Sequence, residues 1–295
     1  MPRFPYETVD VFTDRPFGGN PLAVFTDAQG LSDAQMQALA AEMNYSETTF
    51  VLPPDDPAND ARVRIFHRTA EMPFAGHPNV GTAYVLARHG RDRDGVLRFE
   101  QKAGLVEIAV ERDVTGEVAG AVIAAPQPLS LGVELPVDAI AACAGLSAKD
   151  IVTAAHRPVQ ASVGVTFVLT EIAAGALAAA TPDLTAFRKL AGQHAALAGR
   201  LSLFLYARDG DAIRARMFAP LAGTWEDPAT GSASATLGAL LVSLDGGEAA
   251  SYTITQGVEM GRPSLLKVTA RRAADGFRSR VGGSCAPMFR GETLL

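Results

Sequence analysis

Short runs in which apolar and polar residues alternate occur along the whole chain, separated by turns rich in glycine and proline. Alternation of this kind is typical of strands that bury one face against a core. The pattern therefore predicts a protein in which strands outnumber helices. We expect strands over residues 8–13, 22–25, 48–52, 63–67, 97–99, 106–110, 121–124, 163–169, 201–207, 213–218, 253–256, 265–268 and 276–281.

Several segments instead carry signals for helices. Ser32 is followed three residues later by Gln35, which forms a capping-box pattern, and the Ala/Leu/Met-rich run after it reaches Met43 before Asn44, a residue suited to ending a helix. Pro78 stands in the first turn of a second expected helix, where proline is tolerated. We expect helices over residues 32–43, 76–88, 136–146, 184–198 and 231–242.

Two parts of the chain echo each other. The sequence Arg64-Ile65-Phe66 recurs as Arg216-Met217-Phe218, 152 residues later, and Ala75-Gly76-His77 corresponds to Thr230-Gly231-Ser232, 155 residues later. In each part a strand leads through a proline-containing loop to a glycine and a polar residue that open a helix, and the three-residue difference is a loop insertion. The echo predicts two duplicated halves.

The predicted organisation is therefore α/β, with two similar domains. We expect an N-terminal domain over residues 1–128, a C-terminal domain over residues 129–280, and a closing strand over residues 281–295. Whether this strand crosses back to the first domain is not determined by the sequence. The helix at 231–242 is apolar on nearly every face, as is typical of a helix in the centre of a domain. Equivalent loops of duplicated halves are expected to face one cleft, a favoured place for a ligand.

Composition narrows the class of protein. The 295 residues carry a net charge of −6, which disfavours a nucleic-acid-binding protein, and the absence of a long apolar run predicts no membrane span. The two cysteines, Cys143 and Cys285, predict no disulfide framework. The first residues lack the apolar core of a signal peptide, so we expect a cytoplasmic protein.

Candidate chemistry gathers near the two glycine turns. The first turn of a helix has unpaired amides and partial positive charge, so the helices that begin at Gly76 and Gly231 could bind a carboxylate or a developing enolate. Glu47, His77 and Asp227 lie between or beside expected elements. Each also has an ordinary explanation: a surface carboxylate for Glu47, a structural histidine for His77, and a turn or capping residue for Asp227.

Several other mechanisms lack their motifs. No serine lies in a G-x-S-x-G sequence, no Cys/His cluster has zinc spacing, and neither a Walker loop nor a G-x-G-x-x-G sequence occurs. We therefore expect neither a metal nor another cofactor. A hydrolase that uses Ser232 with His77 and Asp227 stays open as an alternative that a serine-directed reagent would detect.

Six motifs in this order resemble those of the phenazine-biosynthesis isomerase family, PhzF-like proteins with the diaminopimelate-epimerase fold. Together they extend over almost the whole chain. They lie at residues 9–12 with 18–24, 44–48, 73–78, 226–233, 256–264 and 281–283.

The resemblance implies a mixed sheet or barrel around a central helix in each domain, with the active site in the cleft between them. It also implies a cofactor-independent isomerase, commonly a homodimer, that moves a proton on a small unsaturated or cyclic carboxylate. Glu47 corresponds to the family's acid/base, and His77 and Asp227 to its assisting residues. The substrate-binding residues that we expect are Asn20, Gly76, Gly231, Ser232, Gln256 and Gly257.

One departure bears on mechanism. Related racemases and epimerases place a catalytic cysteine before each glycine, whereas this chain has Ala75 and Thr230 there, and neither can act as a thiolate base. We therefore expect a carboxylate, Glu47, to do the proton transfer, with burial raising its basicity. The alternative is a non-catalytic ligand-binding or regulatory protein that keeps the cleft.

Overall fold

The computed structural model describes residues 2–209 and 212–295. The chain divides into two compact units: unit 1 contains Met1–Ala124 and Gly282–Leu295, and unit 2 contains Ala125–Val281. The first division lies four residues before the end of the N-terminal domain as we drew it from the sequence. Within the described ranges, no helix is both long and apolar enough to cross a membrane.

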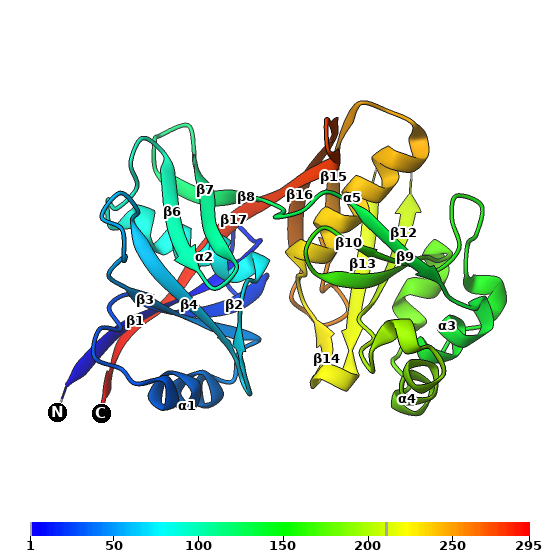
Figure 1. Cartoon of the computed structure of the whole chain (residues 1–295), viewed down its shortest axis with the longest axis horizontal. Coiled ribbons are helices and arrows are strands. Elements are labelled where there is room, and N and C mark those ends of the chain that lie inside the picture. The colour runs from blue at the N-terminus through cyan, green and yellow to red at the C-terminus, as the bar shows by residue number, and fades with distance from the viewer. Residues whose placement is uncertain (1, 210–211) are drawn as a thin grey trace. The chain divides into compact units, whose positions relative to one another are not determined.

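Unit 1 is built around a closed, mixed barrel (Figure 1). Among the described residues, eight strands pair in the cyclic order β1, β2, β3, β4, β6, β7, β8, β17 and back to β1. The β2–β3 and β4–β6 pairs are parallel, and the short strand β5 pairs antiparallel with the end of β4. The strands are β1 (Arg3–Val11), β2 (Asn20–Phe25), β3 (Glu47–Leu52), β4 (Ala61–His67), β5 (Glu71–Met72), β6 (Val96–Gln101), β7 (Gly104–Arg112), β8 (Val118–Ala124) and β17 (Gly276–Leu294).

Helix α2 (Gly76–Arg88) is the core of unit 1, and every residue from Gly76 to Ala87 is buried. It packs against β1, β2, β3, β7 and β8, and the ring of strands thus surrounds it (Figure 1). Helix α1 (Asp33–Met43) packs against β3 and β4 with one buried face. Its capping box at Ser32 and Gln35 and its left-handed end at Asn44 confirm the signals in the sequence.

Unit 2 uses the same kinds of element around helix α5 (Gly231–Asp245). The helix is buried on nearly all sides and packs against β10, β11, β15 and β16. The strands are β9 (Ser130–Glu134), β10 (Val159–Ser162), β11 (Thr166–Glu171), β12 (Leu203–Asp209), β13 (Ala212–Ala219), β14 (Thr224–Asp227), β15 (Ala249–Gln256) and β16 (Ser264–Ala273). The other helices are α3 (Val137–Cys143), α4 (Leu184–Gln193), η1 (Ala148–Asp150), η2 (Ala174–Ala179), η3 (Ala195–Leu197) and η4 (Pro220–Ala222).

The order of strand pairing repeats between the units. In unit 1 the pairs β1–β2, β2–β3, β3–β4 and β4–β6 are antiparallel, parallel, antiparallel and parallel. In unit 2 the pairs β10–β11, β11–β12, β12–β13 and β13–β15 follow the same sequence. A short strand, β5 or β14, pairs antiparallel with the fourth strand of each series and leads to the buried helix.

The echoed arginines make the same contact in both units. Arg64 Nε and Nη2 each donate to Glu71 at 2.8 Å, and Arg216 Nε and Nη2 each donate to Glu226 at 2.8 Å. Each guanidinium also lies over a phenylalanine ring two residues further along its strand, at 5.1 Å from Phe66 in unit 1. Bidentate pairs of this geometry are among the strongest side-chain hydrogen bonds. The pair thus fastens the short strand that precedes each buried helix.

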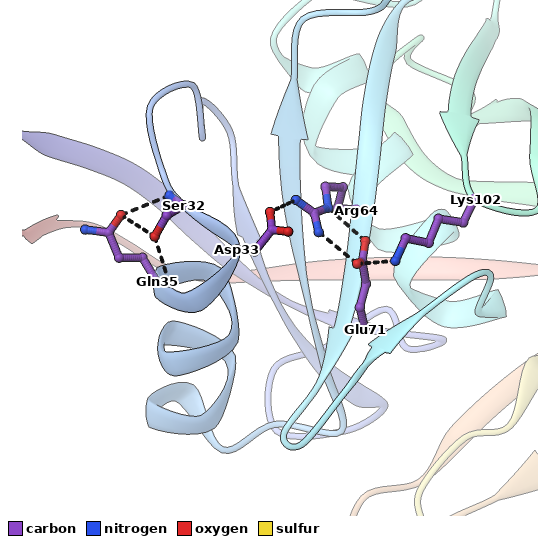
Figure 2. Close-up of polar contacts among 6 residues, drawn as sticks. All are labelled: Ser32, Asp33, Gln35, Arg64, Glu71 and Lys102. Atoms are coloured by element: carbon purple, nitrogen blue, oxygen red, sulfur yellow. Dashed lines mark hydrogen bonds and ion pairs between the residues drawn. The ribbon is translucent and has the colours of Figure 1, made fainter.

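The unit 1 pair belongs to a larger charge network (Figure 2). Arg64 Nη1 also contacts Asp33 at 2.5 Å, in the first turn of α1, and Lys102 forms an ion pair with Glu71. Arg64 therefore joins the start of α1, strand β4 and strand β5. These contacts lower the pKa of Glu71, chiefly through its hydrogen bonds to Arg64.

Four predicted elements need correction. The strand predicted over 163–169 begins only at Thr166, as β11, because Gly164 has a φ of +138° and turns the chain there; β10, which precedes this turn, was not predicted. The helices predicted over 184–198 and 136–146 are shorter, ending at Gln193 and Cys143. The strands predicted over 276–281 and 281–295 form one continuous strand, Gly276–Leu294. Strands β5, β9 and β14 were not predicted.

Candidate active site

The side chains of Glu47 and His77 meet at one end of the unit 1 barrel. Glu47 is the first residue of β3 and His77 the second residue of α2. His77 Nδ1 lies 3.4 Å from Glu47 Oε2, and the two side chains are 6% and 14% exposed. The separation is long for a hydrogen bond, as is common in catalytic sites without substrate. Two residues 30 positions apart in sequence are thus brought into contact.

His77 is neutral at physiological pH. Burial lowers the pKa of its imidazole from 6.5 to about 3. Its place in the first turn of α2 acts in the same direction, since the positive end of a helix disfavours a cation. A neutral ring that faces a carboxylate through Nδ1 carries its proton on that nitrogen. Nε2 is then an acceptor, and in the described part of the chain this buried atom has no hydrogen-bond partner.

The first backbone amides of α2 donate no hydrogen bond to a capping side chain, so a ligand can accept from them. Ala75 is the N-cap, and it provides no side-chain hydrogen bond. Gly76 is the first helical residue and has helical dihedrals, so turn strain does not explain this glycine. Asn79 Nδ2 donates to Ala75 O at 3.0 Å, and the side chains of Asn79 and Gln101 hydrogen-bond each other. The Asn79 side chain of α2 therefore fixes the backbone just before His77.

Asn20 lies beside the start of β3. It is fully buried, and its Oδ1 accepts a hydrogen bond from Ser46 Oγ at 3.2 Å. Since β2 and β3 are parallel neighbours, with Leu22 paired to Glu47, Asn20 and Glu47 occupy the same end of the sheet. Unit 1 thus gathers Asn20, Glu47, Gly76 and His77, four of the residues singled out from the sequence.

The start of α5 in unit 2 gathers the others. Asp227 ends β14, and Gly231 and Ser232 form the first turn of α5, which again has no side-chain cap. Thr230 Oγ1 donates to Asp227 Oδ2 at 2.6 Å, and both residues are buried. Sequence reasoning treated Thr230 only as a position that lacks a cysteine, and did not find this contact.

Gln256 and Gly257 support the same loop. Gln256 Oε1 accepts from Thr230 N at 3.0 Å, and its Nε2 donates to Asp227 O at 2.7 Å and to Thr230 Oγ1 at 3.0 Å. Gly257 has a φ of +75°, and a Cβ there would lie 2.6 Å from Pro228 O. Their contacts hold the 227–230 loop. That the two residues also bind substrate stays a prediction.

Cysteine and metal chemistry have no support near these residues. Cys143 and Cys285 are buried and reduced, and burial raises the pKa of the Cys143 thiol to about 12 and of the Cys285 thiol further. Neither is therefore a thiolate at pH 7. Over residues 2–209 and 212–295, no three His, Cys, Asp or Glu side chains lie together as a metal would require.

Comparison with known proteins decides the family. The family model described as phenazine biosynthesis-like protein, PhzC-PhzF, matches residues 9–291. The chain belongs to the PhzC-PhzF family. It is 37% identical to an uncharacterized isomerase of Mesorhizobium japonicum, over 98% of both chains. It is also 37% identical to trans-2,3-dihydro-3-hydroxyanthranilate isomerase of Pseudomonas chlororaphis, over 98% of this chain and 99% of that relative.

Solved structures agree with the fold. The crystal structure of the Bacillus anthracis phenazine biosynthesis protein of the PhzF family matches with a TM-score of 0.88 and 24% identity, covering 100% of both chains. This PhzF-family protein is thus a mixed α/β protein with an eight-stranded mixed barrel and additional strands. The diaminopimelate-epimerase-like fold that the motifs indicated is confirmed, and the chain is an isomerase of the PhzF family.

Proposed function

We propose that this PhzF-family isomerase moves a proton within a small unsaturated or cyclic carboxylate, with Glu47 as the acid/base and no cofactor. One observation carries the proposal: the Glu47 carboxyl lies against a buried, neutral His77 at the start of α2. These surroundings differ from those of an ordinary surface carboxylate, which is mostly exposed to solvent. The same group removes the proton from one carbon and returns it to another, which suits a shift on one face of the substrate.

His77 assists Glu47 in two ways. Its Nδ1–H stabilises the carboxylate when Glu47 is ionised, and its Nε2 lone pair can accept a hydrogen bond from the substrate. Because the imidazole is neutral, it places no full positive charge beside the Glu47 carboxyl. General acid–base catalysis of this kind is worth about 10²–10⁴-fold in rate.

The remaining stabilisation comes from helix starts. The first amides of α2 have no side-chain cap, and the same is true of α5. Amides in this position stabilise a carboxylate or an enolate-like charge. That Asp227 and Ser232 of unit 2 act on the same substrate as Glu47 stays a prediction, and variants at these positions test it.

A named relative supports the proposed substrate class. The chlororaphis relative is named for a dihydro-hydroxyanthranilate, a cyclic unsaturated carboxylate, and that compound is the first one to assay. A phenazine pathway is a further hypothesis, and so is the homodimer, which sedimentation equilibrium would test. Exposed Phe17 and Trp225 are candidates for substrate selection, since their side chains remain available for contact.

The test is deuterium incorporation from D₂O into trans-2,3-dihydro-3-hydroxyanthranilate and a panel of small cyclic carboxylates. Glu47→Gln keeps the shape of the side chain and removes its basicity, so turnover should fall about 10²–10⁴-fold while binding, measured by calorimetry, persists. Glu42→Gln, on the exposed surface of α1, is the matched control. If the two variants exchange deuterium equally fast, Glu47 is not the base; if the wild-type protein binds carboxylates without exchange, it is a binding protein.

A further inference from the structure

Thr230 occupies the N-cap position of α5, but its side chain does not cap the helix. A threonine at this position normally accepts a hydrogen bond from an amide in the first turn of its helix. Thr230 makes no such bond, and its hydroxyl donates to Asp227 Oδ2 at 2.6 Å instead. The distance is at the short end of the range for a hydrogen bond between a hydroxyl and a carboxyl oxygen. The side chain therefore serves Asp227 and leaves the helix start uncapped.

The Thr230 hydroxyl is itself oriented by a second residue. Gln256 Nε2 donates to Thr230 Oγ1 at 3.0 Å, which occupies the hydroxyl oxygen as an acceptor and directs its own hydrogen toward Asp227. The Gln256 amide is fixed in turn by Thr230 N and Asp227 O. Gln256 is fully buried, and Thr230 and Asp227 are 8% and 7% exposed. Direct hydrogen bonds among these three residues account for the arrangement of their side chains.

The equivalent position in unit 1 has no hydroxyl that could act in this way. Ala75 is the N-cap of α2, and its methyl group can neither donate nor accept. The two echoed helix starts thus differ at the N-cap, and the N-cap hydroxyl is found where a carboxylate lies three residues earlier in the chain.

We propose that Thr230 is a positioning residue that acts through Asp227: its hydroxyl, oriented by Gln256, fixes the Asp227 carboxyl in one orientation for the reaction. The inference rests on the proposed function, in which Asp227 assists Glu47. It explains why a threonine is present at position 230, although its hydroxyl takes no direct part in the proton transfer. Loss of this donor removes one of the contacts that orient the carboxylate, which then reaches the reactive orientation less often.

The experiment compares Thr230→Val with Thr230→Ser. Valine has nearly the same shape and lacks the hydroxyl, so kcat should fall about tenfold or more, with KM changed less than threefold. Serine keeps the donor, so Thr230→Ser should retain kcat within about threefold. Thr236→Val is the matched control, because it removes a buried hydroxyl of the same helix that donates to Ser232 O. Urea denaturation of every variant reports whether it is folded.

Asp227→Asn separates the two ideas. If it is inactive and Thr230→Val works as well as Thr236→Val, the inference fails and the role of Asp227 stands. If serine fails as badly as valine, the hydroxyl is not the cause and the inference is also overturned. If Asp227→Asn keeps wild-type turnover, the proposed role of Asp227 falls, and the positioning role falls with it.

Discussion

His77 Nδ1 lies 3.4 Å from Oε2 of Glu47, at the buried start of α2. The contact has a consequence for stability as well as for chemistry. Because the histidine is neutral in the folded protein and titrates near 6.5 once unfolded, protons bind the unfolded chain preferentially over part of the acidic range.

We therefore predict a pH-dependent contribution of His77 to stability. The pKa is 6.5 unfolded and about 3 folded, so the stabilising contribution is complete above pH 6.5 and is lost as the pH falls from 6.5 toward 3. Between pH 7.5 and pH 5 the wild type should lose about 2 kcal/mol more than His77→Gln. Urea denaturation at the two pH values measures it, with His194→Gln as a control. Equal losses in wild type and His77→Gln would contradict the burial of a neutral ring.

A second prediction concerns the two arginine–glutamate pairs. The Arg216 and Glu226 side chains are 8% and 10% exposed, and Arg216 Nη1 also donates to two backbone carbonyls. Arg216→Met leaves Glu226 buried and unpaired, so it should cost about 3–5 kcal/mol in the free energy of unfolding. Arg64→Met should cost less, about 1–3 kcal/mol, because Lys102 still neutralises Glu71.

The double variant Arg216→Met with Glu226→Leu is the control for this prediction. Removal of both charges should recover most of the lost stability, because the penalty comes from the uncompensated carboxylate rather than from the missing contact. If the double variant is less stable than Arg216→Met, the pair contributes mainly through packing.

The third prediction tests the close approach of α2 to the barrel. A Cβ on Gly81 would lie 2.6 Å from Leu22 Cδ2 and 2.7 Å from Val11 Cγ2. Gly81→Ala should therefore destabilise the protein by about 1–3 kcal/mol. Gly192, within α4, has no atom within 4 Å of its Cβ position, so Gly192→Ala should stabilise by about 0.5–1 kcal/mol. Thermal denaturation of the pair should thus shift in opposite directions, and a shared direction would contradict the packing.

Elements that show periodicity or capping chemistry could be predicted from the sequence. Helix α1 was predicted at both ends, since Ser32, Gln35 and Asn44 act through local bonds. The hairpin at Gly164 was missed, because an apolar run does not show that the chain turns within it. Strands β5 and β14 were too short to show a period, although they carry the two glutamates of the arginine pairs.

The residues of the candidate site were identified from sequence motifs more than from their spacing along the chain. Glu47 and His77 were singled out, but their contact depends on β3 and α2 meeting at one end of a barrel, which no local pattern encodes. The roles of Gln256 and Thr230 depend on hydrogen bonds between residues 26 positions apart. A sequence shows that a side chain can donate, while the fold decides which acceptor it meets.

The pairing of β1 with β17 joins Arg3 to Leu294, at opposite ends of the chain (Figure 1). During synthesis, the ribosome releases the first seven strands of the unit 1 ring long before the last one. Until residues 282–295 emerge, the edges of β1 and β8 have no partner, and such edges invite pairing with other chains. The N-terminal unit is therefore the last to be completed, so a nascent chain halted short of its final strand cannot assemble the barrel around Glu47 and His77.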